Sequence, residues 1–75
     1  MARLPRVTAR EARRAIERDG WFAIKSSGGH QHFRHPTTPG RVTIPVHSGG
    51  NLTPGTVKGI VTQAGLSVQA FIDLL

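Results

Sequence analysis

The sequence predicts an α+β domain of two layers, in which helices cover one face of a three-stranded antiparallel sheet. Capping residues and apolar spacing indicate one helix near the start of the chain and two near its end. Between them lie three short segments of strand-like composition, separated by turns that contain glycine or proline. Consecutive strands joined by short loops pair antiparallel, which leaves one face of the sheet for the helices.

The first helix is predicted from about residue 9 to residue 19. Thr8 and Glu11 have the spacing of a capping box, in which each side chain accepts a hydrogen bond from the other residue's backbone amide. Gly20 suits the left-handed position that follows a helix. Residues 1–7 show no pattern and are expected to form a flexible arm.

The three strands are expected to follow directly. The strands are predicted over residues 21–25, 31–35 and 41–46. The connections between them are predicted over residues 26–29 and 36–40. In the third strand Val42, Ile44 and Val46 alternate with other residues, so one of its faces is apolar. Pro45 has no backbone N–H to give to a ladder, so this end of the strand is expected at an edge of the sheet.

A connection over residues 47–52 leads to the second helix. Thr53 is its expected cap, Pro54 its first helical residue and Gly65 its end. Ser67 then caps a last, short helix. This order of elements resembles that of the double-stranded-RNA-binding fold.

The chain of 75 residues is expected to form one domain, because it is too short for a second core. It has no cysteine, which excludes disulfides and thiolate metal sites. No apolar run of the kind found in a signal peptide follows its cationic start, and no stretch is long and apolar enough to span a membrane. We therefore expect a soluble, cytoplasmic protein that has no membrane partner.

Charge is the strongest compositional signal. The chain has ten lysines and arginines and four acidic residues, which gives a net charge of +6. Nine of the ten cations lie within the first 41 positions. Such an excess points to a polyanionic partner, most commonly nucleic acid, with solubility or docking on an acidic protein as the alternatives. On the first helix Arg10, Arg14 and Arg18 recur every fourth residue and form either a solvated face or a track for phosphates.

Candidate functional residues concentrate in residues 26–36, which hold three of the four histidines. On an extended strand, residues two apart share a face. His30, His32 and Arg34 are therefore expected on the open face of the sheet. Phe33 points to the opposite face and is expected in the core.

The same alternation does not favour a metal site. Such a site would need His30, His32 and His35 together, but His35 is expected on the face of Phe33, and no carboxylate or cysteine is near in sequence. We therefore predict no metal. Two alternatives remain for the histidines. They either take part in catalysis, or they are surface residues that only help to bind RNA or face water.

Histidine suits proton transfer near neutral pH because its ordinary pKa is about 6.5. RNA carries its own nucleophile, the 2′-hydroxyl, so a single base can start strand cleavage without a metal or a covalent intermediate. His30 directly follows a glycine pair and is the candidate base, and His32 on the same face is the candidate for an assisting role. The residues expected to bind or stabilise phosphate are Gly28, Gly29, Lys25, Arg34 and Arg41.

Four segments of the chain match the pattern of a known family. They are residues 28–36 (Gly-Gly-His-Gln-His-Phe-Arg-His-Pro), 39–45, 53–56 and 63–66. In this order and spacing, over about residues 9–75, they resemble the HicA toxins, which are small mRNA interferases of HicA–HicB toxin–antitoxin systems.

The resemblance implies a double-stranded-RNA-binding-like fold and a metal-independent ribonuclease that cleaves mRNA and so blocks translation. The catalytic histidine of the family corresponds to His30, and the family usually has Ser or Thr where this chain has Gly29. A HicB-type antitoxin protein is expected to bind the toxin and cover this histidine. The expected function is thus that of a type II toxin with no cofactor, and the alternative is a non-catalytic RNA-binding module.

Overall fold

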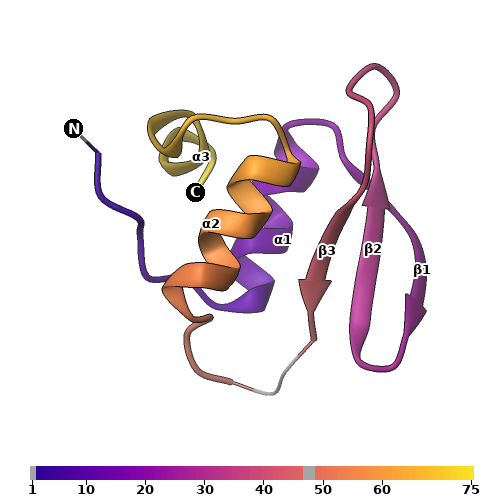
Figure 1. Cartoon of the computed structure of the whole chain (residues 1–75), viewed down its shortest axis with the longest axis horizontal. Helices are drawn as coiled ribbons and strands as arrows, with labels where there is room; N and C mark the ends of the chain where they lie inside the picture. Colours follow the sequence, from indigo (N-terminus) through magenta and orange to yellow (C-terminus); the bar gives the residue numbers. More distant parts are fainter. Residues whose placement is uncertain (1, 47–48) are drawn as a thin grey trace.

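The computed structural model describes residues 2–46 and 49–75 and has the predicted order of elements (Figure 1). The elements are α1 (Ala9–Arg18), β1 (Phe22–Ser27), β2 (His30–Arg34), β3 (Val42–Pro45), α2 (Pro54–Gln63) and α3 (Val68–Leu74). The α+β class and the three-stranded antiparallel sheet are confirmed. Part of the predicted connection over residues 47–52 lies outside the described residues.

Helix α1 begins at the predicted capping box. The amide of Glu11 donates to Oγ1 of Thr8 at 3.1 Å, and the amide of Thr8 donates to Oε1 of Glu11 at 2.9 Å. The helix ends one residue earlier than predicted, because Asp19 is its C-cap. Gly20 follows with a φ of 104°, a conformation that glycine adopts without the steric cost of a Cβ atom.

The sheet has the order β1-β2-β3, and both pairs of strands are antiparallel. The prediction of a turn over residues 26–29 was partly wrong, because Ser26 and Ser27 belong to β1. Ser27 pairs with His30, which makes His30 the first residue of β2, and only Gly28 and Gly29 connect the two strands. Strand pairing thus overrides the preference of serine for turns.

The observed limits of β2 and β3 also differ by one residue from the predicted ones. His35 lies just outside β2, and Arg41 and Val46 lie just outside β3. The expectation that Pro45 lies on an edge strand is confirmed, because β3 pairs with β2 alone.

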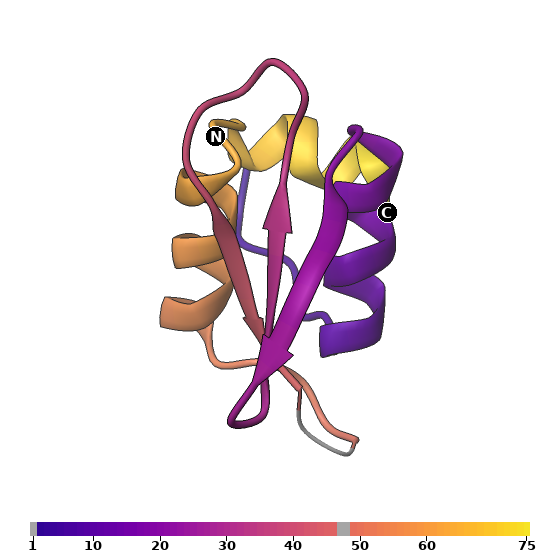
Figure 2. The same cartoon turned by 90° about the vertical axis from the view of Figure 1, so that its right-hand side faces the viewer.

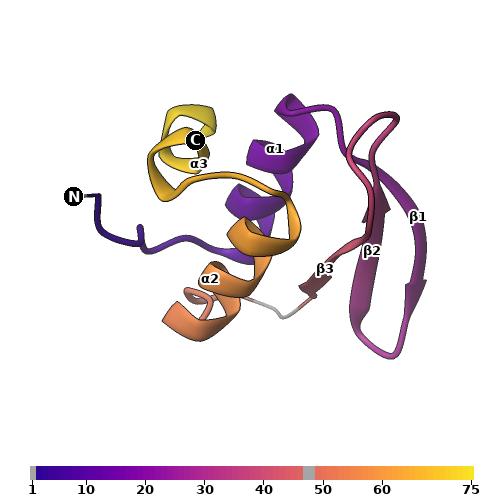
Figure 3. The same cartoon turned by 45° about the horizontal axis from the view of Figure 1, so that its top comes forward.

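The helices lie together on one side of the sheet, and the opposite side is open (Figure 2). Helices α1 and α2 both contact β3, and α3 packs against α1 and α2 on the side away from the sheet (Figure 3). All six residues of β1 are exposed. Within the described part of the chain, no helix has both the length and the apolarity needed to cross a membrane.

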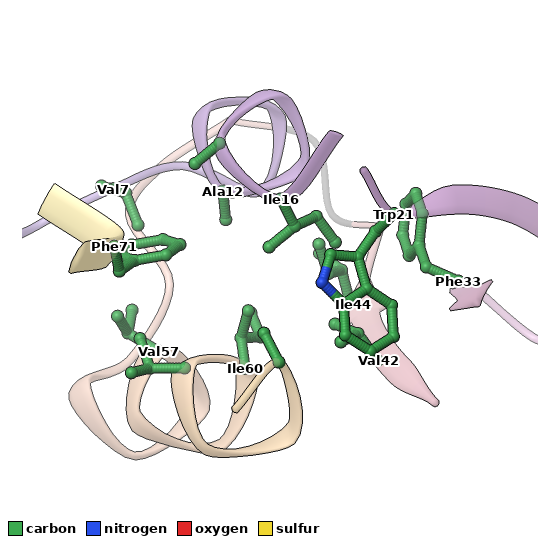
Figure 4. Close-up of a cluster of buried hydrophobic side chains, with 13 residues drawn as sticks. Val7, Ala12, Ile16, Trp21, Phe33, Val42, Ile44, Val57, Ile60 and Phe71 are labelled. Carbon is green, nitrogen blue, oxygen red and sulfur yellow. The ribbon is translucent and has the colours of Figure 1, made fainter. Parts of the chain in front are cut away.

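A single apolar cluster joins the helices to the inner face of the sheet (Figure 4). Its buried residues are Val7, Ala12, Ala15, Ile16, Trp21, Phe33, Val42, Ile44, Val57, Ile60, Val61, Ala64 and Phe71. Val7 lies at the end of the segment predicted as a flexible arm, but its side chain is in the core and Leu4 packs against the cluster. The mobility of the rest of that segment stays a prediction.

Candidate nucleic-acid interface

Strand β2 has one face toward the helices and one face open. Phe33 is fully buried, and the side-chain oxygen of Gln31 accepts a hydrogen bond at 3.3 Å from Nη1 of Arg13 on α1. Because side chains alternate along a strand, His30, His32 and Arg34 lie on the open face. The predicted alternation of β2 is confirmed, including the place of Phe33 in the core.

Strand β1 adds to the same open face through a β-bulge. Phe22 pairs with Arg34 before the bulge, and Lys25 pairs with His32 after it, where the register shifts between Ala23 and Lys25. Directly paired residues of antiparallel strands point to the same face. Phe22 and Lys25 are three positions apart and would lie on opposite faces of a regular strand, so the extra residue of the bulge brings both to the open face.

His32 is held by a hydroxyl group on each side. Its Nδ1 lies 3.0 Å from Oγ1 of Thr43 on β3, and its Nε2 lies 3.4 Å from Oγ of Ser27 on β1. Partial desolvation of the half-buried ring, followed by the positive charges of Arg41 and Lys25 and by the neighbouring His30, lowers the pKa of His32 below the ordinary value of 6.5. The imidazole of His32 is therefore mainly neutral at pH 7.

His30 differs from His32 in its access to solvent. It is exposed, and it stands at the tip of the β1–β2 hairpin between its pairing partners Ser27 and Pro45. Among the described residues, no side chain or backbone group forms a hydrogen bond with its imidazole. Both of its ring nitrogens are therefore accessible to a substrate on the open face.

Three cations lie on this face or at its border. Arg34 and Lys25 lie on the open face, and Arg41 lies just before β3 and close enough to His32 to lower its pKa. Nη1 of Arg34 donates to the carbonyl of Gly40 at 3.3 Å. In residues 2–46 and 49–75 the one ion pair joins Arg13 and Glu17 on α1, so none of the three cations is neutralised by a carboxylate there. This face attracts anions.

The two glycines of the hairpin are explained by the turn itself. Gly28 and Gly29 have φ values of 56° and 80°, and a two-residue hairpin loop with two positive φ angles favours glycine strongly. A Cβ atom at either position would meet no atom within 4 Å, so the positive φ angles, and not lack of space, explain the glycines. The carbonyl of Gly29 accepts a hydrogen bond from the amide of Val46 at 2.6 Å. The predicted contact of the glycines with phosphate stays a prediction.

The arginines of α1 do not all remain available for a partner. Nη1 of Arg18 donates to the carbonyl of Leu74 at 2.6 Å and so connects α1 to the end of α3. Arg10 and Arg14 are exposed, but they belong to the helical layer and not to the open face of the sheet. Both interpretations of this helix, a solvated surface and a phosphate track, stay open for these two residues.

The three histidines of the stretch do not converge. His35 contacts the backbone of Asp19 and the ring of Trp21, away from His30 and His32. In the described ranges, with residues 1, 47 and 48 set aside, no group of three or more histidine or acidic side chains is placed to hold a metal ion.

Sequence reasoning missed three residues of this face. Ser27 and Thr43 hold His32, and Phe22 has an aromatic side chain that is 49% exposed on the same face. The places of all three residues depend on the strand register, and those of Phe22 and Ser27 depend also on the bulge in β1. The alternation of residue types within one strand does not reveal either. For Thr43, the pairing of β2 with β3 was the signal that could have identified it.

Comparison with known proteins gives one family. The model of the HicA toxin of bacterial toxin–antitoxin systems matches residues 9–66, which is more than half of the chain and includes α1, the sheet and α2. No curated protein sequence matches the chain. The chain belongs to the HicA toxin family of bacterial toxin–antitoxin systems.

Proposed function

We propose that this HicA toxin is a metal-independent endoribonuclease that cleaves mRNA, with His30 as the group that transfers the proton. The observation that carries the proposal is the open face itself. It holds an exposed histidine and several cations, and among residues 2–46 and 49–75 neither the ring nitrogens of His30 nor the charges of these cations have a partner side chain that neutralises them. A histidine of this kind can serve as a base near neutral pH.

The proposed reaction uses the nucleophile of the RNA. His30 removes the proton of a 2′-hydroxyl, whose oxygen attacks the adjacent phosphorus. The bond between phosphorus and the 5′-oxygen then breaks, and this oxygen takes a proton from water or from protonated His30. The products are a 2′,3′-cyclic phosphate and a 5′-hydroxyl, and each of these steps can proceed without a metal or a redox cofactor.

We assign His32 an assisting role rather than that of a general acid. Its lowered pKa keeps it neutral near pH 7, and a neutral imidazole is a poor source of protons for a leaving group. When Nδ1 accepts from the hydroxyl of Thr43, Nε2 carries the proton and can donate to a phosphoryl oxygen. His32 thereby supports the bound phosphate while His30 moves the proton.

The cations and the exposed aromatic ring supply binding. Lys25, Arg34 and Arg41 attract the phosphate groups of an RNA strand that lies along the open face. Phe22 offers a flat apolar surface on which an unpaired base can stack, and such stacking is tolerant of sequence. We therefore propose single-stranded segments of mRNA as the substrate.

Membership of a toxin–antitoxin family implies an antitoxin partner. We propose that this partner is a HicB-type protein with an acidic surface, which covers His30 and the cations around it. The net charge of +6 supports this, because a surface of opposite charge speeds association and discriminates against other partners.

Induced expression of the toxin without its antitoxin tests the activity. Wild type is expected to arrest growth and to degrade mRNA, and His30→Ala is expected to do neither. Lys58→Ala is the matched control, because Lys58 is an exposed cation on α2, away from the open face.

A non-catalytic RNA-binding module is the second candidate, because cations and an exposed ring are sufficient for binding without cleavage. It predicts that His30→Ala and wild type bind RNA equally and that neither cleaves it. Growth arrest by His30→Ala equal to that of wild type would contradict the catalytic role of His30.

A further inference from the structure

His35 lies where the end of α1 meets the connection between β2 and β3. Its Nε2 is 2.7 Å from the carbonyl oxygen of Asp19, the C-cap of α1. Its ring centroid is 5.2 Å from that of the buried Trp21, at an interplanar angle of 57°. A Cβ atom at Gly20 would lie 2.8 Å from Nε2 of His35, so a larger residue at this position would displace the imidazole.

The second ring nitrogen of His35 holds the loop that follows. The amides of Thr37 and Thr38 each lie 3.1 Å from Nδ1 of His35. A backbone amide can only donate and the carbonyl of Asp19 can only accept, so Nδ1 carries the lone pair and Nε2 the proton. One neutral tautomer therefore satisfies all of these contacts at once.

The held loop leads directly to two cations of the open face. Nη1 of Arg34 donates to the carbonyl of Gly40 at 3.3 Å, and Arg41 is the next residue after Gly40. The backbone between residues 36 and 40 thus connects His35 with both arginines. Loss of the contacts of His35 would free this loop and with it the orientation of the two guanidinium groups.

We propose that His35 is a positioning residue, which fixes the loop over residues 36–40 and thereby orients Arg34 and Arg41 toward an RNA phosphate. The role rests on the proposed function, because RNA is the ligand whose phosphate the arginines contact. His35 itself touches neither the substrate nor His30. Its position explains how a histidine outside the open face contributes to binding at that face.

A double-mutant cycle on RNA affinity tests this role. All variants are made in the His30→Ala background and measured with one single-stranded oligonucleotide, so that cleavage does not interfere. His35→Phe keeps an aromatic ring against Trp21 but removes both nitrogen contacts, and we expect it to weaken binding about three- to tenfold. We expect His35→Gln, which retains a donor and an acceptor, to restore part of the affinity.

The cycle with Arg34→Ala decides between positioning and a merely structural effect. If His35 acts through Arg34 and Arg41, His35→Phe weakens binding less in the Arg34→Ala background than in the parent protein. Independent, additive losses would overturn the role. If the parent protein does not bind RNA, the proposed function fails together with this role, whereas binding with additive losses overturns this role alone.

Nitrogen-15 NMR of the unaltered protein tests the geometry even if the variants do not fold. The expected result is a proton on Nε2 of His35, a lone pair on Nδ1, and slow hydrogen exchange at the amides of Thr37 and Thr38. A proton on Nδ1, or fast exchange at both amides, would overturn the proposal.

Discussion

Three histidines within six positions of the chain have three different environments. His30 is exposed, and its imidazole has no hydrogen-bond partner in the part of the chain that the structure describes. His32 is held between Thr43 and Ser27, and His35 contacts the end of α1. The surroundings of each ring, rather than the residue type, therefore determine which of the three can exchange protons with a substrate.

His32 gives a prediction for pH titration. We expect NMR to measure a pKa below 6.5 for His32, and Arg41→Gln to raise it, because that variant removes a nearby positive charge. A titration midpoint of His32 at or above the ordinary value of 6.5 would contradict this account of its surroundings.

The same lowered pKa makes the stability of the fold depend on pH. The unfolded chain binds the proton of His32 more readily than the folded chain does. The contribution of His32 is therefore complete above a pH of about 6.5 and decreases as the pH falls toward the folded pKa. Chemical denaturation at a series of pH values measures it, and this decrease is expected to be smaller in Arg41→Gln.

The glycine before His30 gives a prediction for stability. Gly29 has a φ of 80° with no atom near a built Cβ, so Gly29→Ala adds backbone strain without a steric clash. We expect the free energy of unfolding to fall by about 1–2 kcal/mol. Gly59→Ala is the matched control, because Gly59 lies inside α2 with equally open space, and we expect it to raise stability by about 0.5–1 kcal/mol. Equal effects of the two substitutions would show that the φ of Gly29 is not the cause.

At the scale of elements, strand β1 determines the composition of the open face. Its bulge brings Phe22 and Lys25 to the side of Arg34 and His32. Phe22 is 49% exposed although it is large and apolar, so its ring is accessible to a ligand. The strand thus supplies both a ring and a cation to the proposed RNA site.

Phe22→Ala tests the part of this strand in RNA binding. Loss of one base-stacking surface is expected to weaken the binding of single-stranded RNA by about 1–3 kcal/mol. Leu75→Ala is a control for the loss of an exposed apolar side chain, because Leu75 is 45% exposed at the end of the chain. Unchanged affinity of Phe22→Ala, measured by fluorescence anisotropy, would remove Phe22 from the site.

The elements also show how far sequence reasoning reaches. The capping box of Thr8 and the alternation around Phe33 predicted α1 and the inner face of β2 correctly, because both signals are local. The bulge in β1 and the contact of Thr43 with His32 depend on strand register, which local composition does not determine. His35 bonds to Asp19, 16 positions earlier in the chain, and this contact arises only from the tertiary fold.

At the scale of the whole molecule, the excess of positive charge is distributed over both layers. Lys25, Arg34 and Arg41 gather at the sheet, while Arg18 of α1 contacts the carbonyl of Leu74 and helps to hold α3. The helical layer therefore uses part of its charge for the fold. The sheet leaves its charge exposed, as the proposed binding of RNA and of an antitoxin requires.

Binding of an acidic antitoxin gives a prediction for the folded state. A partner that binds only the folded toxin, at a concentration about 100 times its Kd, adds about 2.7 kcal/mol of stability. For a domain of this size we expect the Tm to rise by about 10 °C or more. The measurement is thermal unfolding of the toxin with increasing antitoxin, and a toxin Tm that does not change at saturation would contradict the proposed interface.

His30 is proposed to transfer the proton in a cleavage that needs no metal. The most direct measurement is the rate of RNA cleavage by purified wild type and purified His30→Ala, each in the presence of EDTA. We predict that wild type cleaves and leaves 2′,3′-cyclic phosphate ends, and that His30→Ala is slower by about 100-fold or more. Equal rates for the two proteins, or loss of wild-type cleavage in EDTA, would contradict the claim.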